Sequence, residues 1–262
     1  MGRKILVTND DGIDAPGLWA LVRAVAPLGE LWVVAPTENQ SAVGAGLTLR
    51  RELRWERYAE APVPGVEAWH VNGTPGDCVM IAEREIVKDF DLVVSGINHG
   101  ANLGRDILAS GTVGGALQGH FRDITSVAFS QVVASFEHLD EVDWSTAERV
   151  AALVTQAVTD SRAPAGPVFL NVNMPLRPFE ALRGMLVTRM GRHGFLQLAE
   201  SGGQSGVVDR ELEVHTNPDT PPGTDIWAIA NGYVSVSPLQ SNLTDHRLID
   251  QLGQRLNGAF PR

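Results

Sequence analysis

The chain of 262 residues is 44% hydrophobic and 20% charged, the composition of an ordinary globular protein with a sizeable core. Its 21 Lys and Arg residues against 31 Asp and Glu residues give a formal net charge of −10, which argues against broad electrostatic binding to nucleic acid or to an anionic membrane. The only cysteine, Cys78, excludes an intrachain disulfide and a cysteine-only zinc site.

The first residues do not resemble a signal peptide. Arg3 and Lys4 are charged, and the apolar run after them is too short for the hydrophobic region of a signal peptide. No stretch approaches the roughly 18 consecutive apolar residues of a transmembrane helix. We therefore expect a cytoplasmic protein that has no membrane partner.

The first predicted element is a buried strand at 5–7 that leads to two carboxylates. The run Ile5-Leu6-Val7 is continuous rather than alternating, as in a parallel strand covered by helices on both faces. Ligands bind beyond the carboxyl ends of such strands, which is where Asp10 and Asp11 follow. Adjacent carboxylates repel each other unless a shared proton, a cation or solvent intervenes, and a divalent metal is our first hypothesis.

Helices and buried strands then alternate, which predicts an α/β fold with a doubly wound, mostly parallel sheet. Between them, 47–71 is predicted to form a hairpin or a pair of extended segments inserted in the sheet. Thr74 and Ser145 are the candidate N-caps. The predicted strands lie at 31–35, 91–95, 126–130 and 168–173, and the predicted helices lie at 18–25, after Thr74, after Ser110 and at 144–160.

The pattern changes after residue 175. Extended pieces at 186–188, 202–206 and 212–214 are more typical of an arm than of a core, and a helix is predicted at 244–256. We therefore expect residues 1–175 to form the catalytic core. Residues 176–262 are expected to add an extended β arm with hairpins and a C-terminal helix that complete the same domain.

Oxygen-bearing side chains follow three of the predicted strands. Asp10 and Asp11 follow the first, Ser41 lies in the polar loop after the second, and Asn98 lies in the loop after the strand at 91–95. Because these loops share one edge of the sheet, the side chains can converge. All-oxygen donors suit Mg²⁺, Mn²⁺ or Ca²⁺, and no histidine or cysteine cluster competes for zinc. Taken singly, each residue also fits an ordinary turn or cap.

A phosphate site is predicted where the helix after residue 110 begins. Ser110, Gly111 and Thr112 would offer free backbone N–H groups and the positive end of the helix dipole, although glycines for tight helix packing explain the same pattern. The segment is not a Walker loop, because no Gly-Lys-Ser/Thr follows. Asn102 would bind the same phosphate or stabilise its own loop. His99 is either a general acid or a solvated loop histidine.

Several sequence blocks occur in a recognisable order across most of the chain. They are Val7-Thr8-Asn9-Asp10-Asp11-Gly12-Ile13, Ala35-Pro36 with Asn39-Gln40-Ser41, Val71-Asn72-Gly73-Thr74-Pro75, Ser95-Gly96-Ile97-Asn98-His99-Gly100-Ala101-Asn102, Ser110-Gly111-Thr112-Val113-Gly114-Gly115-Ala116, and Thr224-Asp225 with 232–239. In these blocks the chain resembles the SurE survival-protein family of nucleoside monophosphate phosphatases.

The resemblance implies a Rossmann-like α/β fold and hydrolysis of nucleoside 5′- and 3′-monophosphates. It also implies one divalent metal ion per subunit, Mg²⁺ or Mn²⁺, and homodimers or homotetramers that exchange their C-terminal segments. The implied metal ligands are Asp10, Asp11, Ser41 and Asn98. The chain departs from its relatives at 189–208, where a Gly/Ser run replaces an Arg- and Tyr-rich stretch, so base preference does not follow.

Our working hypothesis is phosphomonoester hydrolysis by a metal-activated water, with Asp10 and Asp11 as the catalytic pair. Asn102 and the residues of the predicted phosphate site would orient the phosphate. One alternative is a covalent aspartyl-phosphate intermediate, although the Asp-x-Asp loop of such phosphatases would begin here with Asn9. The other is a nucleotide- or phosphate-sensing module without turnover.

Overall fold

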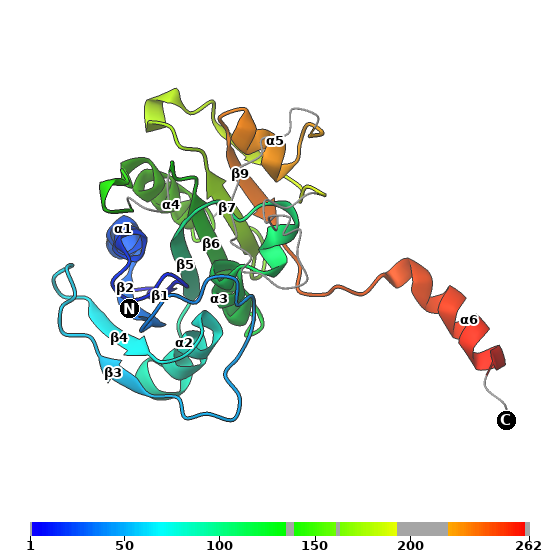
Figure 1. Ribbon diagram of the computed structural model, residues 1–262, viewed down its shortest axis with the longest axis horizontal. Helices are drawn as coiled ribbons and strands as arrows, with labels where there is room; N and C mark the ends of the chain where they lie inside the picture. The colour runs from blue at the N-terminus through cyan, green and yellow to red at the C-terminus, as the bar shows by residue number, and fades with distance from the viewer. Residues whose placement is uncertain (1, 135–138, 161–162, 193–219, 260–262) are drawn as a thin grey trace, which may run out of the picture.

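The apolar runs of the sequence form one nine-stranded sheet in this computed structural model, which describes residues 2–134, 139–160, 163–192 and 220–259 (Figure 1). The strand order is β3-β4-β2-β1-β5-β6-β7-β9-β8. All the predicted core strands are present and run parallel. They are β1 (Lys4–Thr8), β2 (Glu30–Pro36), β4 (Glu67–Val71), β5 (Leu92–His99), β6 (Thr125–Gln131) and β7 (Phe169–Met174).

Antiparallel pairing occurs toward both edges of the sheet. At one edge β3 (Trp55–Arg57) pairs with β4, which is the hairpin predicted within 47–71. Toward the other edge β9 (Val234–Pro238) pairs antiparallel with β7, and β8 (Met185–Val187) then pairs parallel with β9. The sheet therefore continues past residue 175, and the segment after the parallel core supplies two of its strands.

Helices cover both faces of the sheet, so the fold is α/β as predicted (Figure 1). On one face α1 (Pro16–Val25) packs against α4 (Ser145–Ala157), and on the other α2 (Pro75–Ile81) packs against α3 (Gly111–His120). Since each central strand contacts a helix layer on both faces, most of its side chains are buried. This two-sided burial explains why the strand sequences are continuously apolar.

The helix termini confirm one predicted cap and correct another. Thr74 forms a capping box with Asp77, in which each side chain accepts a hydrogen bond from the other residue's backbone N–H. At α4, however, the N-cap is Trp144, so Ser145 is wrong as a cap. The Asp143 carboxylate instead accepts the Ser145 N–H at 2.9 Å. A carboxylate two residues earlier thus binds a free N–H group at the start of α4.

Short helical turns complete the description of the core. They are η1 (Ala26–Leu28), η2 (Ala82–Ile86), η3 (Gly104–Leu108), η4 (Leu139–Glu141) and η5 (Phe179–Ala181). Of these, η3 lies between the loop that follows β5 and the start of α3. It therefore links two of the segments in which site residues are predicted.

After β8 the chain forms α5 (Asp225–Ala230), β9, the turn η6 (His246–Leu248) and α6 (Ile249–Ala259). The helix α6 extends away from the sheet, and Leu252 and Leu256 on it are exposed (Figure 1). It begins five residues later than predicted, because Asp245 caps the preceding turn η6. The predicted extended pieces at 202–206 and 212–214, and most of the departure at 189–208, lie outside the described residues.

No described helix is both long enough and apolar enough to cross a membrane.

Candidate active site

The site residues lie where the strand order of the parallel sheet reverses. From β1 the chain proceeds to β2 on one side, whereas β5 pairs with β1 on the other side. Such a switch point opens a crevice at the carboxyl ends of the strands, where ligands bind in α/β sheets. The loop after β1 brings Asp10 and Asp11 there, and the end of β5 brings Asn98 and His99.

Asp10 lies directly under the N-terminus of α3. Its Oδ1 accepts a hydrogen bond from the Thr112 hydroxyl, and its side chain is 3% exposed. A Cβ atom on Gly111 would lie 2.7 Å from the Asp10 Cβ, so only glycine permits this approach. Burial raises the pKa of Asp10 to about 7, and the charge of Asp11 adds to the rise, whereas the Thr112 hydrogen bond opposes it.

Asp11 is paired with the histidine whose role the sequence left open. Its Oδ2 lies 3.0 Å from the His99 Nδ1 and accepts the His99 backbone N–H at 3.4 Å. Burial lowers the pKa of His99, but the hydrogen bond to Asp11 and the Asp11 charge outweigh it, so the pKa is raised. The other oxygen of Asp11, Oδ1, is buried and has no hydrogen-bond partner.

The loop after β2 reaches the same place from the other side. The Gln40 N–H donates to the Asp10 carbonyl at 2.6 Å, and the Gly44 N–H donates to the Ala109 carbonyl at 2.8 Å. Ser41 lies between these anchors with an exposed side chain. The structure therefore brings the Ser41 segment against both the Asp10 backbone and the residue that precedes Ser110.

Asn98 lies at the end of β5, beyond an irregularity in the pairing with β6. The register shifts between Ser95 and Asn98, and the side-chain Nδ2 of Asn98 donates to the Gly100 carbonyl at 2.8 Å. Because this amide nitrogen is engaged, Oδ1 is the atom with which Asn98 would bind a cation. The predicted ligands thus come from the loops after β1 and β2 and from the end of β5, which extends through Asn98 where a loop was predicted.

The donor set fits a hard divalent cation. A buried carboxylate oxygen without a partner, Asp11 Oδ1, is costly unless a cation or a proton compensates it. Within the described residues no three His, Cys, Asp or Glu side chains form a metal cluster, so a cation here depends on two carboxylates and neutral oxygens. That combination suits Mg²⁺ or Mn²⁺ better than zinc. Asp10, Asp11, Ser41 and Asn98 would hold it.

The phosphate site was predicted at the N-terminus of α3, and the structure changes one part of that prediction. Ser110 is the N-cap, and its hydroxyl oxygen accepts the Val113 N–H at 3.2 Å. The Thr112 hydroxyl donates to Asp10 and its side chain is fully buried, so this hydroxyl is not directed to a phosphate. What remains for an anion are the backbone N–H groups of Gly111 and Thr112, which a helix cannot satisfy internally.

Several residues of the site environment were not predicted. The Asn102 backbone is hydrogen-bonded to Asn171 and Asn173 of β7, and its side-chain Nδ2 donates to the Ser130 Oγ at 2.9 Å. The Gly104 N–H donates to the buried Asp225 carboxylate at 2.8 Å. One signal could have revealed the asparagines, since polar residues two apart in a central strand lie on one face and need partners there.

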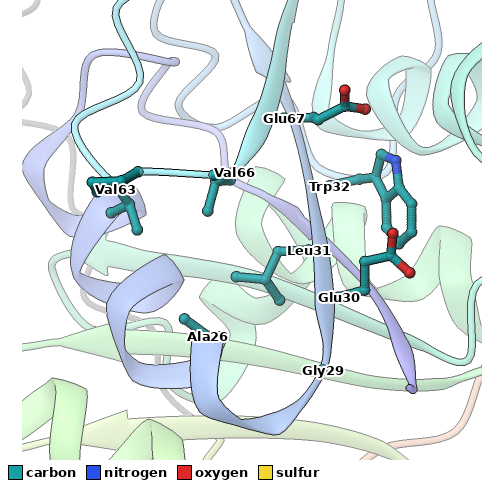
Figure 2. Close-up of a pocket in the computed structure, with 10 residues that line it drawn as sticks. Ala26, Gly29, Glu30, Leu31, Trp32, Val63, Val66 and Glu67 are labelled. Carbon is teal, nitrogen blue, oxygen red and sulfur yellow. The ribbon is translucent and has the colours of Figure 1, made fainter. Parts of the chain in front are cut away.

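A separate pocket lies at the opposite, amino-terminal end of β2. Figure 2 shows this pocket, of about 260 Å³, between the start of β2 and the turn before β4. Leu31 and Val66 line it together with the carboxylates Glu30 and Glu67. It contains none of the predicted site residues, because the amino and carboxyl ends of a strand lie at opposite edges of a parallel sheet.

The chain is similar to proteins of one family. The family model described as "Survival protein SurE" matches residues 5–197. A Thermus thermophilus protein named "5'-nucleotidase SurE 1" is 42% identical over 260 residues, which cover 98% of this chain and 100% of the relative. A Dehalococcoides mccartyi protein named "5'-nucleotidase SurE" is 41% identical over 248 residues, which cover 92% of this chain and 89% of the relative.

A solved structure shows the same fold. The crystal structure of the SurE protein from Aquifex aeolicus superposes with a TM-score of 0.80 at 34% sequence identity, covering 97% of this chain and 99% of that one. The match covers nearly the whole of each chain. By its sequence and its fold, the chain belongs to the SurE family.

Proposed function

We propose that the protein is a metal-dependent phosphomonoesterase that hydrolyses nucleoside 5′- and 3′-monophosphates to nucleoside and phosphate. The observation that carries the proposal is the position of the buried pair Asp10 and Asp11 under the N-terminus of α3. Carboxylates that hold a cation and N–H groups that hold an anion lie side by side there. The names of the relatives, "5'-nucleotidase SurE", support a nucleotide as the substrate.

In this proposal, one set of residues binds the cation and another set binds the phosphate. Asp10 and Asp11 supply the negative charge that retains a divalent cation, and Ser41 and Asn98 add neutral oxygens. When bound, such a cation lowers the pKa of a water molecule and neutralises charge on the phosphoryl oxygens. Asn102, Ser110 and the backbone N–H groups of Gly111 and Thr112 orient the phosphate, so that stabilisation of the transition state is mainly electrostatic.

His99 holds Asp11 in this scheme. Its Nδ1 and its backbone N–H both contact Asp11 Oδ2, so the carboxylate cannot rotate freely and its Oδ1 stays directed into the site. The contact with Asp11 raises the pKa of His99, so the imidazole is charged in a larger fraction of molecules at neutral pH than a solvated histidine. A charged His99 balances part of the charge of the carboxylate pair.

The decisive test is the variant Asp11→Asn. Since the amide keeps the shape but removes the charge and one potential ligand oxygen, we expect kcat for 5′-AMP at saturating Mn²⁺ to fall by about a hundredfold or more. The matched control is Asp14→Asn, which neutralises a carboxylate of the same loop that is exposed and accepts the Tyr58 hydroxyl. Full activity of the Asp11 variant would refute the proposed role.

The alternatives give different results in the same preparation. A fluoroberyllate adduct bonded directly to Asp10 or Asp11 would indicate a covalent aspartyl-phosphate route instead of attack by water. A purified protein that releases no phosphate from any nucleoside monophosphate, yet is stabilised by one, would be a sensor. A panel of nucleotides with Mg²⁺, Mn²⁺ and no added metal therefore separates an enzyme from a sensor, and the fluoroberyllate adduct separates the two hydrolytic routes.

We also propose that the protein forms homodimers or homotetramers through exchanged C-terminal segments. The helix α6 projects from the sheet in Figure 1, and Ile249, Leu252 and Leu256 are exposed along it. Exposed apolar residues on an otherwise isolated helix favour contact with another surface. Light scattering of the full chain and of a chain ending at residue 240 should give a larger assembly for the full chain.

A further inference from the structure

The loop that carries Asn102 is held by a buried residue of β7, and we propose that this residue, Asn173, positions Asn102 for phosphate binding. The inference rests on the proposed function, because Asn102 is a phosphate ligand in that proposal. Asn173 itself is fully buried and acts only through the loop. It is therefore a positioning residue and not a catalytic one.

Asn173 binds both polar groups of a single backbone residue. Its Oδ1 accepts the Asn102 N–H at 2.8 Å, and its Nδ2 donates to the Asn102 carbonyl at 3.0 Å. Facing residues of antiparallel strands exchange the same pair of bonds, so the amide takes the place of a strand partner for the loop. A primary amide offers a donor and an acceptor side by side without a charge, which is what this contact requires.

The sheet makes Asn173 a rigid support. In the register of the strands it lies between Ser130 of β6 and Ser235 of β9, so its backbone is paired on both sides. Asn171, on the same face of β7, donates its Nδ2 to the same Asn102 carbonyl at 2.9 Å. Because the side chain of Asn102 also donates to Ser130, three side chains from two strands determine where this residue lies.

The ends of the loop are anchored independently of Asn173. On one side the Gly100 N–H donates to the Gln131 carbonyl at 2.8 Å, and on the other the Gly104 N–H donates to Asp225 at 2.8 Å. Loss of the Asn173 contacts therefore leaves Asn102 held only by Asn171 and Ser130, so the middle of the loop is held less firmly while both ends stay in place. The expected consequence is weaker binding of phosphate rather than unfolding.

Two substitutions test the proposal. Asn173→Leu removes both hydrogen bonds with a side chain of similar size, and Asn173→Asp keeps an acceptor but removes the donor to the Asn102 carbonyl. For each we expect KM for 5′-AMP and the Kd for inorganic phosphate, measured by calorimetry, to rise about tenfold. We expect kcat to change by less than about threefold and the half-saturating Mn²⁺ concentration to stay the same.

The matched control is Thr188→Val, which removes a buried hydroxyl from the edge of the same sheet. That hydroxyl contacts the Ser235 and Ser237 hydroxyls at 2.7 Å each and does not contact the loop. Its loss should lower Tm but leave KM unchanged. If the Asn173 variants lower Tm like the control and also leave KM unchanged, Asn173 is only structural and the inference is overturned.

A double variant shows whether Asn173 acts through Asn102. In an Asn102→Ala background the phosphate ligand is already absent, so adding Asn173→Leu should raise KM no further. If Asn173→Leu raises KM by the same factor with and without Asn102→Ala, the two residues act independently and the inference is overturned. A wild-type protein without turnover overturns the proposed function instead, and phosphate binding then still decides the role of Asn173. If neither Asn173 variant folds while Thr188→Val does, the residue is required for folding and the inference fails.

Discussion

The two loops that meet at the switch point of the sheet differ in how their polar groups are satisfied. The loop after β1 brings two carboxylates into a buried position, and Asp11 Oδ1 there has no hydrogen-bond partner. The loop after β5 carries amides, and Asn102 within it is bound at its N–H, its carbonyl and its side chain. The first loop thus leaves a buried carboxylate oxygen unsatisfied, whereas the polar groups of Asn102 in the second are satisfied by the protein itself.

Because of this difference, the two loops contribute to the stability of the folded protein with opposite signs. Burial of like charges disfavours the folded protein unless a cation or a proton neutralises them, so without either the loop after β1 lowers the stability of the protein. Hydrogen-bonded neutral groups raise stability and reduce motion, so the loop after β5 supports the geometry of the site. Substitutions in the two loops should therefore change stability in opposite directions.

The largest expected effect is that of Asp10→Asn. Activity toward 5′-AMP should fall by about a hundredfold or more, because the charge that retains the cation is lost. The same change should raise the Tm of the metal-free protein at pH 8 by about 2 °C or more, because a buried carboxylate is replaced by a neutral group. Asp14→Asn, in the same loop, should change neither. If the Tm of metal-free Asp10→Asn is below that of the wild-type protein, the loop after β1 does not lower stability as argued above.

The next largest effect is expected at Asp225, which anchors the end of the loop after β5. The buried Asp225 carboxylate accepts three backbone N–H groups, those of Gly104, Gly191 and Ile226, at 2.8, 2.7 and 2.8 Å. Asp225→Asn weakens these charged hydrogen bonds, and we expect a loss of about 3 kcal/mol in the free energy of unfolding. Urea denaturation measures it. The control Asp250→Asn, on the exposed helix α6, should have no measurable effect.

Protonation of Asp10 should make both the stability of the metal-free protein and its affinity for a divalent cation depend on pH. Because the pKa of Asp10 is raised from 3.8 to about 7 in the folded state, the metal-free protein keeps a proton that the unfolded chain has released. Its stability therefore falls as pH rises from about 4 to about 7. A divalent cation requires ionised Asp10, so its apparent affinity should rise by up to about tenfold per pH unit in that range.

Thermal shift with and without Mn²⁺ at several pH values measures this dependence. The stabilisation by Mn²⁺ should grow with pH in the wild-type protein and should vary much less with pH in Asp10→Asn. An equal pH dependence in both proteins would mean that a group other than Asp10 takes up the proton.

The smallest expected effect is that of Ser110→Ala. The Ser110 hydroxyl caps α3, so its removal should cost about 1 kcal/mol of stability and raise KM for 5′-AMP a fewfold. Thr224→Ala is the matched control, since Thr224 caps α5 through the Trp227 N–H. Both variants should lose similar stability in urea, and only the Ser110 variant should change KM. If KM is the same in Ser110→Ala as in the wild-type protein, Ser110 does not contribute to phosphate binding.

Much of the core and the positions of the site loops followed from local patterns. Continuous apolar runs predicted the parallel strands, and the Thr74 cap predicted the start of α2. Asp10, Asp11 and Asn98 were placed at one edge because they follow buried strands. The cap at Ser145 was wrong, because α4 already includes Ser145: Trp144 is the N-cap, and the Ser145 N–H donates to the Asp143 carboxylate.

The contacts that tune the site could not be predicted in the same way. Nothing within nearby sequence indicates that the Thr112 hydroxyl donates to Asp10, or that His99 pairs with Asp11 across 88 positions of the chain. The role of Asn173 likewise depends on a loop that lies 71 positions earlier. Each of these contacts joins segments that are neighbours only in the folded sheet.

The sequence by itself determined the kind of sheet, the edge at which the candidate site lies, and the residue types that meet there. Apolar periodicity and the order of strands are local properties, and they are sufficient for those conclusions. Only the tertiary structure decided which oxygen of Asp11 lacks a partner, why Gly111 must be a glycine, and which amide holds Asn102. The reason is physical: burial, close approach and hydrogen bonding depend on distances between strands, which no local pattern records.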